Sequence, residues 1–281
     1  MKTIKNQSFD NERALYESQD LLVLDCRFTG EADGESALKE SKNIEARNCY
    51  FNLRYPFWHD YNAKIVNCEM TGLCRAPIWY SSKIEIDSCV IDSVKALREC
   101  QDIAIKNTTV NSSEFGWDCM GISAIDSSFS SEYFMARSKN LSFKNVKMSG
   151  KYSFQYIENS LFEDCNFDTK DAFWHAKNVT VKNSTIKGEY LGWYCEDVTF
   201  ENCTIIGTQP LCYCKNLTLV SCKMIDCDLS FERSTVNATI TSHIDSIKNP
   251  KSGCIKALSV GEIISDYKDF DCKIDTGCGV L

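Results

Sequence analysis

A period of nineteen residues constrains this chain more than any other feature of its sequence. Counted from Cys89, the residues at successive intervals of nineteen are small or apolar, and an Asn, Asp or Ser precedes each one. They are Thr108, Ser127, Val146, Cys165, Ser184, Cys203 and Cys222, and Cys68, Cys49 and Cys26 continue the series backward with spacings of 21, 19 and 23. A fixed period of this length is typical of a solenoid, in which each repeat buries its apolar side against its neighbours.

The pattern within one repeat predicts short strands separated by bends. Numbered from the reference position, the columns at −5, −3 and +2 are almost wholly apolar, as at Ile84, Ile86 and Ile91, with polar residues between them. This alternation indicates strands with one buried face. Asn or Asp dominates at −6 and −1, and Gly or Ser is frequent at +4, which suits tight bends. Asparagines stacked in such columns can also bond from coil to coil.

We therefore predict an all-β fold: a single-stranded, right-handed parallel β-helix of about eleven coils, because parallel crossovers are right-handed. We expect one domain over residues 1–281. In it, residues 1–19 form an N-terminal cap, residues 20–239 the regular coils, and residues 240–281 an irregular last coil and C-terminal cap. The caps would cover the open strand edges at the two ends.

Seventeen cysteines would suggest disulfides or metal clusters in another chain, but here eleven of them fall into two columns. The second column lies eleven places after the reference and contains Cys100, Cys119, Cys195 and Cys214. Both columns exchange Cys for other small residues, so we expect reduced thiols that pack as small hydrophobes, with no metal site. Cys74, Cys227, Cys272 and Cys278 lie off the two columns and are the candidates for regulatory oxidation.

The formal charge of −8 and pI near 5.1 argue against nucleic acid or an anionic membrane as a general partner. No segment is apolar enough for a signal peptide or a membrane-spanning helix, so we expect a cytoplasmic protein. No cofactor is indicated. The acidic segment Glu31–Glu35 could bind calcium weakly, although a solvated loop is the simpler interpretation.

All five tryptophans fall nine places after the reference, once longer spacers are aligned to the next coil. The following column, at +10, mixes His, Tyr, Glu, Asp and Arg, which a β-helix interior could hardly accommodate. We expect +10 to face solvent and +9 to lie beside it, with inward tryptophans as the alternative. The predicted ligand-binding residues are Trp58, His59, Trp79, Tyr80, Trp117, Tyr156, Trp174, His175, Trp193 and Tyr194.

Three uses of this aromatic stripe remain open from the residues alone. It could shield the fold or a contact in a homo-oligomer, bind a carbohydrate-like ligand without chemistry, or support catalysis. For catalysis the candidates are Glu99, Asp118 and Arg137 on consecutive coils, with carboxylates roughly 5 Å apart, near the separation in retaining glycosidases. The competing interpretation is a charge ladder in which Arg98 and Arg137 neutralise the two carboxylates.

Several segments carry a resemblance to a known family. They are RYPFWHD (54–60), GKYSFQY (150–156), TKDAFWHAKNVTVKNS (169–184), GEYLGWYCE (188–196) and GTQPLCYC (207–214). The chain, from about residue 7 to 265, resembles the uncharacterised bacterial domain-of-unknown-function family 3737. The resemblance implies a pectin-lyase-like right-handed β-helix and implies no activity. The aspartate clusters and calcium sites of polysaccharide-degrading relatives are not matched residue for residue, and fold alone is weak evidence for function.

Overall fold

The computed structural model describes residues 1–30, 34–266, 268 and 271–277, which excludes Cys278 and most of the acidic segment 31–35. It divides into two compact units, Met1–Ser142 (unit 1) and Phe143–Leu281 (unit 2). Every regular element among the described residues is a β-strand, and these residues include no helix that could cross a membrane. The expectation of a single domain stays a prediction.

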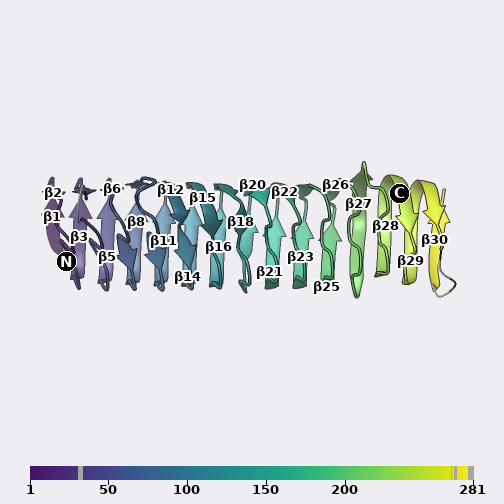
Figure 1. Cartoon of the computed structure of the whole chain (residues 1–281), viewed down its shortest axis with the longest axis horizontal. Helices are drawn as coiled ribbons and strands as arrows, with labels where there is room; N and C mark the ends of the chain where they lie inside the picture. The colour runs from purple at the N-terminus through teal and green to yellow at the C-terminus, as the bar shows by residue number, and fades with distance from the viewer. Residues whose placement is uncertain (31–33, 267, 269–270, 278–281) are drawn as a thin grey trace. The chain divides into compact units, whose positions relative to one another are not determined.

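Unit 1 contains three rows of short strands, and strands of consecutive coils lie side by side (Figure 1). The first row comprises β1 (Lys2–Lys5), β3 (Gln19–Leu24), β5 (Lys42–Arg47), β8 (Tyr61–Val66), β11 (Ser82–Asp87), β14 (Gln101–Lys106) and β16 (Met120–Ile125). The second comprises β2 (Ser8–Phe9), β4 (Arg27–Thr29), β6 (Tyr50–Asn52), β9 (Glu69–Met70), β12 (Val90–Lys95), β15 (Thr109–Phe115), β17 (Ser128–Ser131) and β18 (Tyr133–Phe134). The third comprises β7 (Phe57–Trp58), β10 (Ile78–Trp79) and β13 (Leu97–Arg98).

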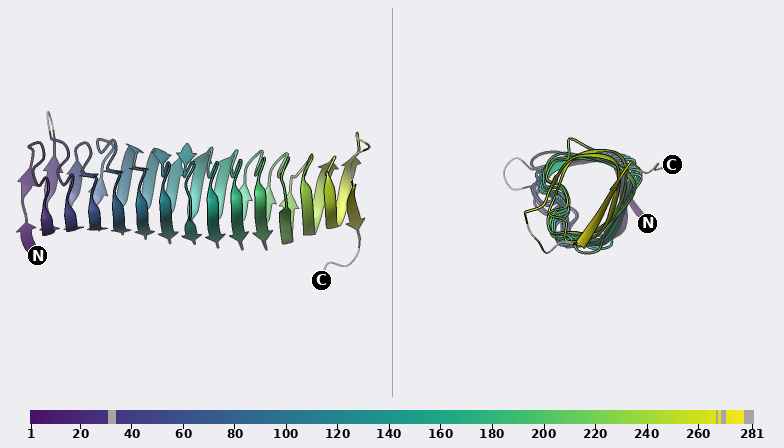
Figure 2. Two further views of the ribbon diagram at one scale, coloured as in Figure 1. Left: turned by 90° about the horizontal axis from the view of Figure 1, so that it is seen from below. Right: turned by 90° about the vertical axis from the view of Figure 1, so that its right-hand side faces the viewer.

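Unit 2 repeats two of these rows (Figure 2). One comprises β21 (Glu158–Glu163), β23 (Lys177–Lys182), β25 (Glu196–Glu201), β27 (Leu217–Ile225), β28 (Thr235–Lys248), β29 (Ser252–Ile264) and β30 (Asp271–Thr276). The other comprises β20 (Lys147–Lys151), β22 (Asn166–Lys170), β24 (Thr185–Lys187) and β26 (Thr204–Ile206), while β19 (Ser142–Lys144) contains the unit boundary.

The strand register confirms the predicted class, a parallel β-helix with a period of about 19. Ile84 pairs in parallel with Ile103, and Ile103 pairs with Ile122, so equivalent residues of successive repeats are direct neighbours. In unit 2, Val179 pairs with Val198 in the same way. The apolar columns therefore form buried rows. Some neighbouring phenylalanines stack within them, as Phe28 does on Phe51 at 4.9 Å.

The described residues form about 14 coils rather than the eleven that the sequence predicted. At the start, β1 and β2 pair in parallel with β3 and β4, so the residues assigned to a cap supply strands. At the end, β28, β29 and β30 continue the pairing. The period is interrupted there because one coil shortens: Val236 pairs with Gly253, 17 residues on, and the register shifts again between Ile240 and His243. The next pairing, Ser252 with Asp271, returns to 19 residues.

The bends depend on asparagine and cysteine, as the columns predicted. Asn48 and Asn67 both have positive φ, and the Asn67 amide donates to Asn48 Oδ1 at 2.7 Å, which forms a ladder between coils. The described cysteines are all free, and all but Cys254 and Cys272 are buried. Most of the buried thiols donate to a backbone carbonyl of the preceding coil, as from Cys203 to Val181 O at 3.3 Å. Reduced thiols thus fill the corners, as expected.

The described candidates for regulatory oxidation, Cys74, Cys227 and Cys272, are poorly suited to that role. Cys74 and Cys227 are fully buried, and burial raises the pKa of Cys74 to about 11 and that of Cys227 to about 12. Burial likewise raises the pKa of the half-buried Cys272 to about 11. Because the thiolate is the reactive form, these shifts oppose the predicted regulatory role.

Candidate functional site

The residue at position +10 adopts a left-handed backbone conformation, which gives the candidate site its backbone shape. His59, Tyr80 and Glu99 have φ of 62°, 56° and 49°, and in unit 2 His175 and Tyr194 have φ of 56° and 61°. Each non-glycine residue in this region costs about 1 kcal/mol or more. The conformation is held by hydrogen bonds between coils, such as His175 N to Trp193 O at 2.9 Å. The bend is therefore fixed by the fold.

This bend breaks the strand alternation and sets which side chains reach solvent. Position +9 is half-buried at all five tryptophans, and position +10 is exposed at the predicted His, Tyr, Glu and Asp residues. Position +11 points inward and is small in most coils, as at Cys100 and Cys195. The predicted outward direction of the +10 column is confirmed, and the tryptophans lie along the surface beside it.

Unit 1 contains one half of the predicted site. Trp58 and Trp79 are neighbours, with ring centroids 5.2 Å apart, and the exposed His59 and Tyr80 stack beside them at 5.0 Å. The Arg98 guanidinium continues the tryptophan row. It lies 5.2 Å from the ring centroids of both Trp79 and Trp117, in the geometry of a cation–π contact on each side.

The three candidate catalytic residues of unit 1 include an ion pair. Arg137 donates from Nε and one terminal nitrogen to the two carboxylate oxygens of Asp118, each at 2.7 Å. This bidentate pair corresponds to the charge ladder that we set against catalysis. The other half of that ladder is wrong, because Arg98 stacks between indoles and forms no ion pair with Glu99 among the described residues. Catalysis by Glu99, Asp118 and Arg137 stays a prediction.

Unit 2 contains a more regular stack of rings. Tyr156, His175, Tyr194 and Tyr213 follow one another with centroids 4.7, 5.0 and 5.0 Å apart and interplanar angles of 6°, 8° and 15°. Trp174 and Trp193 stack beside them at 5.4 Å and 6°. Within these stacks each ring covers the face of its neighbour. The stacks therefore present ring edges and hydroxyl groups to solvent.

The hydrogen bonds of the indole nitrogens lock this arrangement. Trp174 donates to Tyr190 O at 2.7 Å and Trp193 donates to Gln209 O at 2.8 Å. Gln155 occupies the equivalent place one coil earlier, and its amide donates to Asp171 O at 3.2 Å. Because a buried N–H needs an acceptor, these bonds fix the angle of each +9 side chain.

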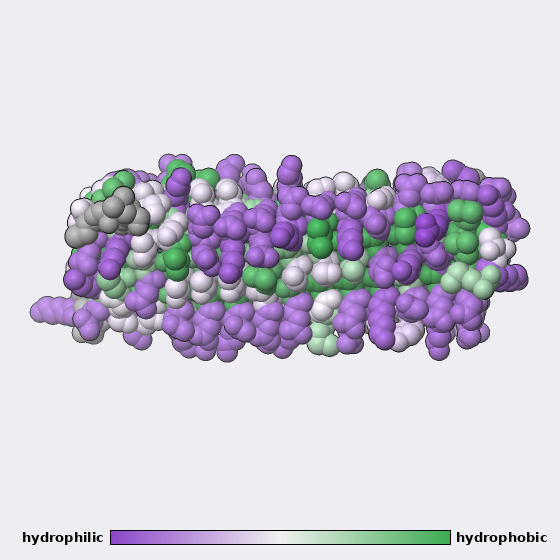
Figure 3. Space-filling view, turned by 180° about the vertical axis from the view of Figure 1, so that it is seen from behind, coloured by the Kyte–Doolittle hydropathy of each residue, from purple (hydrophilic) through white to green (hydrophobic). Residues whose placement is uncertain are grey.

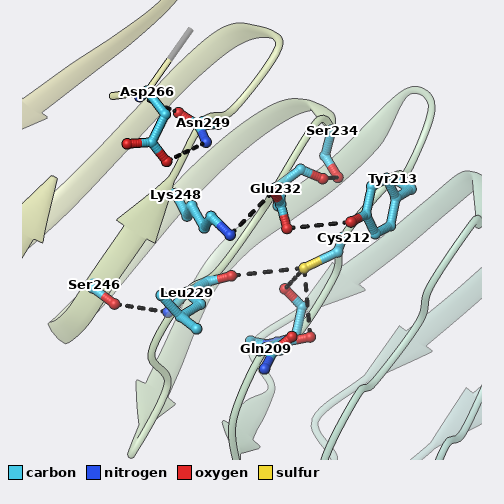
Figure 4. Close-up of polar contacts among 11 residues, drawn as sticks. Gln209, Cys212, Tyr213, Leu229, Glu232, Ser234, Ser246, Lys248, Asn249 and Asp266 are labelled. Atoms are coloured by element: carbon cyan, nitrogen blue, oxygen red, sulfur yellow. Dashed lines mark hydrogen bonds and ion pairs between the residues drawn. The ribbon is translucent and has the colours of Figure 1, made fainter. Parts of the chain in front are cut away.

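An ion pair fixes the last ring of the unit 2 stack (Figure 4). The Tyr213 hydroxyl donates to Glu232 Oε2 at 3.2 Å, and Lys248 Nζ lies 3.3 Å from the other oxygen of that carboxylate. Partial burial, and then the nearby Glu232 carboxylate, raise the pKa of Tyr213, so this side chain stays a neutral phenol at neutral pH. Glu232 and Lys248 therefore hold the ring in place.

A shallow concavity of about 370 Å³ lies beside the unit 2 stack. One wall consists of His175, Tyr194 and Tyr213, and the other consists of residues two places further along each coil, namely Lys177, Glu196 and Lys215. Unit 1 has an equivalent concavity, and Glu99, Cys100, Gln101, Asp118 and Met120 line it. On the face of the molecule in Figure 3, hydrophilic side chains similarly lie beside apolar patches.

Sequence reasoning missed the charged wall at +12, the Glu232–Lys248 pair and Asp60. The signal for the wall was available, because Lys177, Glu196 and Lys215 alternate in charge at intervals of nineteen. Asp60 was visible too, as an acid in a column of small residues. What could not be read was the pairing of Lys248 with Glu232, because their separation in the sequence does not match the period of nineteen.

The fold and the stripe together define a class of protein, the right-handed parallel β-helix with an outer aromatic ladder. The chain belongs to the family described as proteins of unknown function (DUF3737), whose model matches residues 2–275. No curated protein matches the chain in sequence.

The similar solved structures include a glucanase and a surface adhesin. The catalytic domain of a GH87 α-1,3-glucanase in complex with nigerose matches with a TM-score of 0.53 and 10% identity, over 85% of this chain and 63% of that domain. This chain thus spans less than two thirds of that domain. PfbA, a surface adhesin of Streptococcus pneumoniae, matches with a TM-score of 0.41 and 8% identity, over 86% of this chain and 76% of that chain. At this identity the glucanase likeness shows the fold alone.

Proposed function

We propose that the chain binds a carbohydrate-like ligand in the unit 2 concavity. The observation that carries this proposal is the pairing of its two walls. Ring edges and a phenol hydroxyl lie on one side, and Lys177, Glu196 and Lys215 lie on the other. Ligand sites combine an apolar or aromatic surface with a few fixed polar groups, and a sugar needs both.

The stacked rings set the mode of binding. A sugar cannot lie flat on a ring face that the next ring already covers, as His175 and Tyr194 cover each other at 5.0 Å and 8°. The ligand would instead lie along the concavity, with its hydroxyls bonded to the charged wall and its C–H groups against the ring edges. Because the rings and the charged residues repeat with every coil, this surface suits a chain of repeating units.

Direct titration tests the proposal. Neutral and acidic oligosaccharides would be titrated into the intact chain by isothermal titration calorimetry, and the Tyr194→Ala variant would be compared with Tyr80→Ala. Both tyrosines belong to the +10 column and are similarly exposed, at 46% and 38%, but Tyr80 lies in unit 1. We expect Tyr194→Ala to weaken binding at least several-fold and Tyr80→Ala to leave it unchanged.

The opposite results are equally informative. If no oligosaccharide binds, or if both variants weaken binding equally, the unit 2 concavity is not a glycan site. A chain that self-associates through the stripe, with protection of Tyr194 in the associated form, would then support the alternative of an interaction scaffold. If the chain turned over a bound oligosaccharide, and if Glu99→Gln or Asp118→Asn abolished that turnover, the catalytic hypothesis would be supported.

A further inference from the structure

We infer that the unit 2 concavity selects anionic ligands, so that the bound glycan contains carboxylate or sulfate groups. This inference rests on the proposed function and narrows its ligand class. It depends on two independent features of the concavity, the charges of one wall and the orientation of the rings in the other.

The charged wall contains one cation more than its carboxylate neutralises. Lys177 and Glu196 lie on neighbouring strands and form an ion pair at 3.2 Å. Glu196 also forms a β-bridge to Lys215 on the next coil, but no ion pair or hydrogen bond of the Lys215 ammonium exists among the described residues. The position next in line after Lys215 is Thr235, which is uncharged. Lys215 is therefore an exposed cation available to a ligand.

The aromatic wall favours the same sign of charge. An aromatic ring has a negative face and a positive edge. Since the faces of His175, Tyr194 and Tyr213 cover one another at 5.0 Å and small angles, their edges line the concavity. Ring edges and a free ammonium together make a locally positive strip on a chain whose formal charge is −8. Such a strip would orient an acidic ligand along the coils.

Unit 1 provides an internal comparison. Its concavity lies between the same two columns, yet Glu99, Gln101, Asp118 and Met120 occupy the equivalent positions. Its two carboxylate-bearing lining residues, Glu99 and Asp118, are acids, and no described lysine or arginine lines it. Although Arg137 binds Asp118, Glu99 has no ion-pair partner among the described residues. An anionic ligand should accordingly avoid unit 1, and the selectivity is a property of the residues rather than of the β-helix.

The test compares three oligosaccharides of equal length by isothermal titration calorimetry: an oligogalacturonate, a sulfated dextran fragment and an unmodified dextran fragment. Lys215→Gln removes the free cation. Lys223→Gln is the matched control, because Lys223 is an exposed lysine of unit 2 outside the concavity. We expect an acidic oligosaccharide to bind with salt-dependent affinity, and Lys215→Gln to weaken it by about three- to tenfold, as for a charge-assisted hydrogen bond near the surface. Lys223→Gln should have no effect.

The possible results distinguish a failure of the anionic selectivity from a failure of the proposed glycan binding. Equal affinity for the neutral and acidic fragments would overturn the anionic selectivity and leave glycan binding in place. Binding of none of the three would overturn both. Equal weakening by Lys215→Gln and Lys223→Gln would show general charge attraction and also refute this site. The preference between oligogalacturonate and sulfated dextran identifies the anionic group.

Discussion

Replacing Asp60 with serine should stabilise the protein, and increasingly so as the pH rises. Asp60 is 1% exposed and lies at position +11, where neighbouring coils have Ser41 and Ser81. Its Oδ1 accepts a hydrogen bond from Ser41 N at 3.0 Å, but its Oδ2 is buried without a partner among the described residues. Burial therefore raises the pKa of Asp60 well above its ordinary value, and the Glu40 carboxylate adds to the effect.

The direction of the pH dependence follows from this raised pKa. The unfolded chain releases the Asp60 proton near pH 3.9, whereas the folded chain retains it to a higher pH. The contribution of Asp60 to stability is thus fully present below the unfolded pKa and is lost as the pH rises through the folded pKa. Within that window the loss is at most about 1.4 kcal/mol per pH unit. A serine at this position does not ionise, so the difference in stability between Asp60→Ser and wild type should increase at up to this rate.

Urea unfolding at a series of pH values from mildly acidic to mildly alkaline, followed by circular dichroism, would measure this difference. Asp10→Ser is the control, because Asp10 is an exposed acid of unit 1. We expect Asp60→Ser to gain free energy of unfolding relative to wild type between the lowest and the highest pH, and Asp10→Ser to show no such trend. A difference that is constant with pH would refute a neutral, buried Asp60. A difference that becomes less favourable as the pH rises would mean that the ionised form is the stabilised one.

Three further substitutions test the packing of the stripe and of the corner at position +4. Trp193→Phe removes the indole N–H that donates to Gln209 O and should cost about 1–3 kcal/mol in urea unfolding, since the acceptor is left without its partner. Gly207 has a φ of +129°, and Gly207→Ala would place a methyl group against a backbone carbonyl of the preceding coil. Thermal unfolding should therefore show a loss of about 1–3 kcal/mol in the free energy of unfolding. An unchanged melting temperature would argue against this close approach. Arg137→Gln breaks the bidentate ion pair with Asp118 at an exposed site. This substitution should change the free energy of unfolding by less than about 1 kcal/mol. A larger loss would contradict a surface ion pair.

The repeating coils could be predicted from the sequence because residues of one column occupy the same environment in coil after coil. Ile84, Ile103 and Ile122 each occupy the −5 position, and the structure pairs them directly. The asparagine ladder and the packed thiols were predictable for the same reason. This inference fails where the spacing changes. The shortened coil between β28 and β29 pairs as a strand, but it shifts the columns of the sequence out of phase.

Some features of the candidate site could likewise be predicted from the sequence, and others could not. The sequence by itself determined that the +10 column faces solvent, because His, Tyr, Glu and Asp are expensive to bury, but it left the direction of the tryptophan column open. Only the tertiary structure decided that His175 and Tyr194 present edges rather than faces and that Arg98 stacks between indoles. It also decided that Lys215 has no ion-pair partner within the described part of the chain. Burial of a column depends on residue type, which a sequence records. Ring angles and charge pairing depend on the distance between coils, which only the folded chain fixes.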